Sequence, residues 1–228
     1  MPDQLPHSPS NWLSRAPTRL KSHFWLKCVG TPLFMTGFFV AYFTVLRHPP
    51  SPPLTIPTTA PDRWIAFQPL ALIPYVSLWV YVTLPASLIV VRRELLSHTI
   101  GAFALSVIGL AIFVIWPTTA PTPDIDWTLH PTMQFLKNVD ASGNACPSLH
   151  AAFAVFACLW LARQLNECGA GRLSHGLNYF WAATIVYSTV ATRQHVAIDA
   201  ITGALLGWLV AHINLRFPPA PIPCPVNR

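Results

Sequence analysis

The chain alternates long apolar runs with short segments that are polar, charged or rich in proline. Six of these runs are predicted to form membrane-spanning helices, the fourth of them short, and few charged residues interrupt them. The predicted spans cover residues 24–46, 70–91, 98–116, 148–161, 177–192 and 196–215. The pattern therefore predicts an all-α fold, a six-span transmembrane helical bundle.

The segments around the spans complete the predicted organisation. Residues 1–23 are polar and are expected to form a disordered cytoplasmic tail, and residues 217–228 form a Pro-rich tail. Seven prolines between residues 47 and 69 exclude a regular helix there. A long polar loop, 117–147, separates the third and fourth spans. Residues 24–216 are thus expected to form one transmembrane domain.

Composition supports a membrane protein. Hydrophobic residues make up 53% of the chain and charged residues 10%, against about 25% charged in soluble domains. The mean hydropathy is +0.45. The five cysteines are scattered, which predicts neither a disulfide framework nor a metal site, and no cofactor is expected. Basic residues cluster beside spans, so the lipid bilayer rather than a nucleic acid is the expected partner.

The basic residues also predict the orientation. With six spans, ten of the 14 lysines and arginines fall on the side of the two termini and four on the other side. Positive charge gathers on the cytoplasmic side, so both termini are predicted to be cytoplasmic, in an inner or plasma membrane. The four on the opposite side are Arg47, Arg63, Lys137 and Arg193.

Two short motifs lie where a polar loop meets an apolar run. The first is Cys146–His150, with the sequence CPSLH, and the second is Arg193–Asp199, with the sequence RQHVAID. His195 and Asp199 are four residues apart, so on a helix they share a face, and the carboxylate can orient the imidazole as a nucleophile or base. Ser148 and His150 stand at a predicted helix start, where free N–H groups bind anions.

The predicted topology places both motifs at the outer face. Two histidines, a carboxylate, an arginine and a helix start favour phosphoryl transfer at a membrane surface. Simpler structural interpretations exist: Ser148 is also a typical N-cap, and Arg193 is also a typical interfacial residue. Asp124 and Asp126 are interpreted as solvated loop residues.

The two motifs resemble those of the type 2 phosphatidic acid phosphatase superfamily, which includes the vanadium haloperoxidases. Pro147–His150 resembles its Pro-Ser-Gly-His block, with Leu149 in place of glycine. His195–Asp199 resembles the end of its Ser-Arg…His-x-x-x-Asp block, although Thr189 stands where arginine is expected. The upstream Lys…Arg-Pro block has no counterpart.

These departures resemble one branch, that of the inositol phosphorylceramide and sphingomyelin synthases. In that branch a basic residue precedes the histidine, as Arg193 does here. The resemblance covers about residues 112–207. The missing cations also imply reduced activity or a changed substrate.

The resemblance implies metal-independent phosphoryl transfer on a lipid phosphate. His195 would form a phosphohistidine, Asp199 would orient it, and His150 would protonate the leaving alkoxide. The phosphate-binding candidates are Ser148, Leu149, Arg193 and Lys137. A lipid phosphate phosphatase is favoured, because water needs no second binding site. The alternatives are a lipid phosphotransferase and, more remotely, an intramembrane serine protease using Ser148 or a non-catalytic transporter. The oligomeric state has no signal in the sequence.

Overall fold

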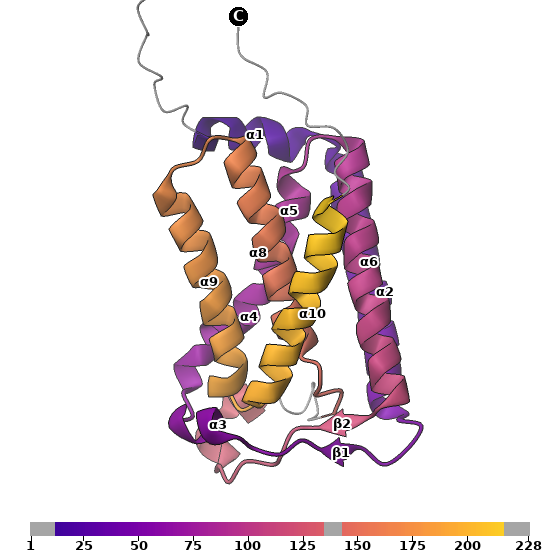
Figure 1. Ribbon diagram of the computed structural model, residues 1–228, viewed down its shortest axis with the longest axis vertical. Helices are drawn as coiled ribbons and strands as arrows, with labels where there is room; N and C mark the ends of the chain where they lie inside the picture. The colour runs from indigo at the N-terminus through magenta and orange to yellow at the C-terminus, as the bar shows by residue number, and fades with distance from the viewer. Residues whose placement is uncertain (1–11, 135–142, 217–228) are drawn as a thin grey trace, which may run out of the picture.

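The structure, a computed structural model, describes residues 12–134 and 143–216. Most of these residues are helical (Figure 1). The helices are α1 (Trp12–Lys21), α2 (Phe24–Arg47), α3 (Ala60–Trp64), η1 (Pro69–Ala71), α4 (Leu72–Tyr81), α5 (Thr83–Leu88), α6 (Arg92–Ile115), η2 (Trp127–Leu129), α8 (Leu149–Glu167), α9 (Arg172–Ala191) and α10 (Ala197–Arg216). The strands are β1 (Leu54–Thr55) and β2 (Thr118–Thr119).

The long helices run up and down the molecule in alternating directions (Figure 1). The helix α8 packs against α9, α10, α6 and the α4–α5 segment, so it forms the centre of the bundle. Its core partners include Leu105, Phe113 and Ala211, all nearly inaccessible to solvent. At one end of the bundle lies α1; at the opposite end lie α3 and both strands (Figure 1).

Four helical segments are long and apolar enough to cross a membrane. They are Phe24–Arg47, Pro69–Leu88, Arg92–Ile115 and Ala197–Arg216. The two remaining predicted spans are present as the helices α8 and α9, which are of similar length but less apolar. The mostly helical, membrane-compatible fold is therefore confirmed, and six spans with cytoplasmic termini stay a prediction.

The helix α8 extends further than the sequence indicated. The fourth span was predicted to cover residues 148–161, yet α8 continues through Arg163 to Glu167. The Arg163 guanidinium donates to Glu167 at 2.7 Å, one turn further on, and to Glu94 of α6 at 2.9 Å. Because two carboxylates pair with the guanidinium, the helix passes through this residue instead of ending at it.

The expectation of disorder over residues 1–23 is wrong for α1. Residues 12–21 are helical, and the chain around them is attached to the end of α5. Arg19 donates to the Leu88 carbonyl at 3.2 Å, and Ser22 donates to the Val90 carbonyl at 3.1 Å. Polar composition alone missed these contacts, because their acceptors lie nearly 70 residues away. Residues 1–11 and 217–228 lie outside the described residues.

Two glycines let α10 lie directly on α8. A Cβ at Gly203 would come within 2.1 Å of the Ser148 carbonyl oxygen, and one at Gly207 within 2.1 Å of the Ala152 carbonyl oxygen. The four-residue spacing of both pairs places the two contacts one above the other. This small-xxx-small pattern is typical of close helix pairs in membranes, and here it joins the two helices that carry the predicted motifs.

A small parallel sheet ties together two segments predicted as loops. Leu54 pairs with Thr118, and Thr55 pairs with Thr119. The second strand then holds the chain that leads into α8, because the Cys146 amide donates to the Thr118 hydroxyl at 2.8 Å. The sheet therefore sets the position of the first motif.

Candidate active site

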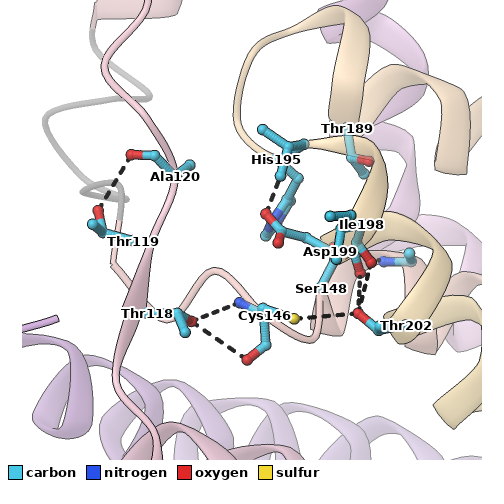
Figure 2. A network of polar contacts seen from close by, with 12 residues as sticks. Thr118, Thr119, Ala120, Cys146, Ser148, Thr189, His195, Ile198, Asp199 and Thr202 are labelled. Carbon is cyan, nitrogen blue, oxygen red and sulfur yellow. Dashed lines mark hydrogen bonds and ion pairs between the residues drawn. The ribbon is translucent and has the colours of Figure 1, made fainter. Parts of the chain in front are cut away.

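His195 and Asp199 face each other at the start of α10 (Figure 2). Their Nδ1 and Oδ2 atoms are 3.6 Å apart, a separation that suits an ion pair and is too long for a hydrogen bond. The Asp199 side chain is fully buried, and the same Oδ2 accepts a hydrogen bond from the Val196 amide at 3.1 Å. The His195 side chain keeps 12% of its surface exposed. With Nδ1 directed at Asp199, Nε2 is the nitrogen available to a substrate.

A tight turn after α9 presents His195. The Thr189 carbonyl accepts from the amides of both Gln194 and His195, at 3.2 and 3.0 Å. Arg193, between them, has a φ of 58°, a left-handed conformation that is unusual for a residue with a Cβ. Thr189 stands where the family pattern has arginine, and it is buried, with its hydroxyl bonded to the Val186 carbonyl. That position therefore offers no cation to a phosphate.

The Arg193 guanidinium is hydrogen-bonded to backbone carbonyls. Its guanidinium donates to the Asp62 carbonyl and to the Ile65 carbonyl, each at 2.8 Å. A guanidinium has five N–H donors, so these two contacts leave donors for an anion. The primary effect seen here is to attach the α3 segment to the turn that carries His195.

Asp62 is a central residue of the site that the sequence analysis missed. Its carboxylate accepts from the Ala197 amide at 2.7 Å and from the Thr59 amide and hydroxyl, both at 2.7 Å. Only 2% of the residue is exposed. A signal for it existed, since Thr59-x-Pro-Asp62 has the spacing of a capping box. Its contact with α10, however, joins residues 135 apart in the chain.

Ser148 connects the two motifs. Its hydroxyl caps α8 by accepting from the Ala151 amide at 3.3 Å, and its own amide donates to the Asp199 carbonyl at 2.9 Å. The Ser148 amide is therefore engaged and is not available to a phosphate, which corrects one part of the predicted binding set. In the part of the chain that the structure describes, the Leu149 and His150 amides have no acceptor, as expected at a helix start.

His150 is held by α4. Its Nε2 lies 2.9 Å from the Tyr75 carbonyl oxygen, and its ring stacks on the Tyr75 ring with centroids 4.0 Å apart. A carbonyl only accepts, so Nε2 carries a proton, and Nδ1 is left for proton exchange. The Trp79 ring meets the imidazole edge-on at 5.9 Å. These contacts fix the ring plane.

Two cavities meet at His195. The first, the apolar cavity, has a volume of about 350 Å³ and is lined by α2, α4 and α8, with both His150 and His195 in its wall. The second, the polar cavity, has a volume of about 420 Å³ and is lined by Asp62, Arg63, Asp124, Arg193 and His195 among others. His195 alone among the described residues lines both cavities. A molecule with an apolar and a polar part would meet His195 at the junction.

Cys146 lies beside this site without a free thiolate. Its Sγ is 3.3 Å from the Thr202 hydroxyl (Figure 2). Burial, together with the nearby Asp199 carboxylate, raises the pKa of the Cys146 thiol. The thiol is therefore protonated at neutral pH and is a poor nucleophile.

The remaining predicted residues do not join the site or cannot be placed. Lys137 lies outside the described residues. Asp126 is turned to its own loop, where hydrogen bonds from the Thr128 hydroxyl and amide lower the pKa of its carboxyl. Among the described residues, no group of three or more histidines, cysteines or carboxylates is placed to hold a metal ion.

The site therefore combines membrane-compatible helices with two histidines in the wall of one apolar cavity. The sequence model of the PAP2 superfamily matches residues 105–222, and the chain belongs to this superfamily. The matched region contains both motifs. It supports a phosphatase or phosphotransferase type of activity and does not single out the synthase branch. Comparison with curated proteins and with solved structures finds no match.

Proposed function

We propose that this protein is a membrane-embedded lipid phosphate phosphatase that acts through a phosphohistidine. The observation that carries the proposal is the position of His195, at the junction of the apolar and polar cavities with Asp199 behind it. A lipid tail lies in the apolar cavity and the phosphate at the junction. No soluble substrate would need the apolar cavity.

In the first step the His195 Nε2 attacks phosphorus, and the bond between phosphorus and the lipid oxygen breaks. Asp199 supports the positive charge that develops on the imidazole, and the 3.6 Å separation is of the kind that shortens when a substrate is bound. His150 enters this step doubly protonated, with its Nε2–H bonded to the Tyr75 carbonyl, and donates the proton of Nδ1 to the departing alkoxide. The lipid alcohol leaves through the apolar cavity.

In the second step a water molecule attacks the phosphorus of phosphohistidine. His150 takes one proton from that water, the bond between nitrogen and phosphorus breaks, and inorganic phosphate leaves through the polar cavity. The Tyr75 carbonyl, bonded to the other nitrogen, supports the protonated ring. The amides of Leu149 and His150, and the remaining donors of Arg193, hold the equatorial phosphate oxygens.

The polar cavity favours a second candidate, a lipid phosphotransferase. A volume of about 420 Å³ is more than a single attacking water requires. An alcohol bound there would replace water in the second step and yield the phosphate monoester of that alcohol. The protease alternative is disfavoured, because Ser148 is fully buried and its hydroxyl caps α8.

The proposal includes the membrane orientation predicted from charge: six spans, cytoplasmic termini and a site on the non-cytoplasmic side. Figure 1 supports it, since α1 and the end of α10 lie opposite α3 and the strands. A reporter fused after residue 130 should be exported, and one fused after residue 170 should be cytoplasmic. The reverse pattern would remove the outer-face site.

The test of the function is phosphate release from a panel of lipid phosphates by the purified protein in detergent. Wild type should release inorganic phosphate and His195→Ala should not. Adding a series of alcohols distinguishes the two candidates, because a phosphotransferase forms the phosphate monoesters of those alcohols at the expense of free phosphate. Release of phosphate from neither the wild type nor the variant, with no phosphate ester of the added alcohol formed, would overturn both.

A further inference from the structure

A third cavity continues the apolar cavity away from the histidines. This distal cavity has a volume of about 340 Å³ and lies between α2, α5, α6 and α8. Phe34, Val82 and Phe153 line it and also line the apolar cavity, so the two are adjacent and separated by these three side chains. Together they form one apolar trough along α2.

The length of the trough follows from the helix. On α2 its lining runs from Leu26 to Phe43, and at 1.5 Å per residue this is about 26 Å. The hydrocarbon core of a bilayer is about 30 Å thick, so one leaflet supplies about half of that. A tail as long as one leaflet therefore fills only the part of the trough next to the histidines.

Charged groups end the trough at the other side. Lys27 and Arg92 line the distal cavity, and the Lys27 ammonium donates to the Arg19 carbonyl at 3.0 Å and to the Ser87 carbonyl at 2.7 Å. These bonds hold the ammonium at the end of α5. A hydrocarbon tail has no favourable contact beyond this charge, so the trough has a defined end.

We infer that the distal cavity receives the far end of the substrate's tail, so that the protein selects lipid phosphates whose tail is longer than one leaflet is thick. The inference rests on the proposed function, because it requires the phosphate to be held at His195. The three shared side chains line the passage between the two parts of the trough. Phe34 and Phe153 make this passage apolar, which excludes a polar head group from it.

Two glycines of α2 offer a matched pair of variants. An added Cβ would meet no atom within 4 Å at Gly30 or at Gly37. Gly30 lines the distal cavity, and Gly37 lines none of the three cavities described above. Gly30→Leu therefore fills the distal cavity, whereas Gly37→Leu adds the same side chain to the same helix elsewhere.

The experiment compares kcat/KM on alkyl phosphates with tails shorter and longer than one leaflet. Wild type should prefer the longer tails. Gly30→Leu should lose about tenfold in kcat/KM on the long substrates, because the added side chain takes the space of the tail's far end. It should lose nothing on the short substrates, which do not reach the distal cavity. Gly37→Leu should match wild type on both. Equal loss on all tails, or no loss on long tails, would overturn the inference.

A second measurement on the wild type does not depend on any variant. A long-tailed alkyl phosphate with a photoreactive group at its end should crosslink to peptides that contain Gly30 or Leu95, in the distal cavity. Crosslinking spread over the lipid-facing helix surfaces would contradict the inference. Absence of any phosphate release would instead refute the proposed function, so the two failures are distinguishable.

Discussion

The Asp62 carboxylate accepts a hydrogen bond of 2.7 Å from the Ala197 amide, at the first residue of α10. Asp62 thereby caps a helix that begins 135 residues later in the chain. A carboxylate at a helix N-terminus is favourable, because it satisfies a free N–H and faces the positive end of the helix dipole. The α3 segment is thus fastened to the helix that carries His195 and Asp199.

Asp62→Ala should lower the free energy of unfolding by about 2 kcal/mol, because a buried cap and its hydrogen bonds are lost. Activity should fall as well, since Arg193 and His195 lose their support from α3. Thermal unfolding in detergent and phosphate release measure the two effects. Asp124→Ala is the control, because Asp124 lines the polar cavity as Asp62 does, but its side chain is exposed. An unchanged melting temperature in Asp62→Ala would contradict this role.

The two histidines should fail in different ways. His195→Ala should form no phosphoenzyme, because the nucleophile is gone. His150→Ala should lose about 10²–10⁴-fold on alkyl phosphates and retain more activity on aryl phosphates, whose leaving groups need little protonation. Acid-labile, base-stable phosphate on rapidly quenched protein is the measurement. Full labelling of His195→Ala would show that another residue is the nucleophile.

Activity should survive EDTA and be inhibited by vanadate. The Asp199 carboxylate beside His195 is engaged with the Val196 amide, and the described residues offer no group of three or more ligands for a divalent metal there. Vanadate imitates the five-coordinate phosphorus of the proposed steps. Phosphate release is measured with and without each reagent. Loss of activity in EDTA with rescue by magnesium would contradict the metal-free mechanism.

Gly203→Ala should disturb both fold and site. The new Cβ would lie 2.1 Å from the Ser148 carbonyl oxygen, so α8 and α10 must separate, at a cost of about 1–3 kcal/mol. Activity should fall because Ser148 also bonds to Asp199. Gly176→Ala in α9 is the matched control. Its Cβ meets no atom within 4 Å, and alanine should stabilise that helix by up to about 1 kcal/mol. Equal melting temperatures for the two variants would argue against the tight packing.

Alkylation of Cys146 should be slow and should need a higher pH than an ordinary thiol. The thiolate is the reactive form, and the raised pKa of Cys146 keeps the thiol protonated where a free thiol, with a pKa of about 8.5, begins to ionise. A short peptide with one cysteine serves as the reference for an ordinary thiol. Peptide mass spectrometry after iodoacetamide treatment over a pH series compares the two. Faster labelling of Cys146 at neutral pH would be inconsistent with its buried position.

The sequence predicted the features that depend on local patterns. Apolar runs located every long helix to within several residues, and the four-residue spacing of His195 and Asp199 predicted that they face each other. The end of α8 was missed, although the i,i+4 spacing of Arg163 and Glu167 is a local signal for a helix that continues. The second partner of Arg163, Glu94, lies on another helix and leaves no local signal.

The candidate site also combines features that local patterns predict with contacts between distant residues that they do not predict. The capping-box spacing of Thr59 and Asp62 was readable, but nothing near Asp62 in sequence indicates that it also caps α10. Arg193 was interpreted as a phosphate ligand from its position beside His195, and the structure adds its two bonds to the α3 segment. Those acceptors are backbone carbonyls, which any residue provides, so composition cannot point to them.

The contact of Gly203 and Gly207 with α8 has a further consequence for motion. The two helices that carry the motifs touch through backbone atoms, without intervening side chains that change rotamer. The helix α2, by contrast, has no fully buried residue. An outward movement of α2 would therefore widen the trough for a lipid without breaking the backbone contact that spaces the two helices carrying the motifs.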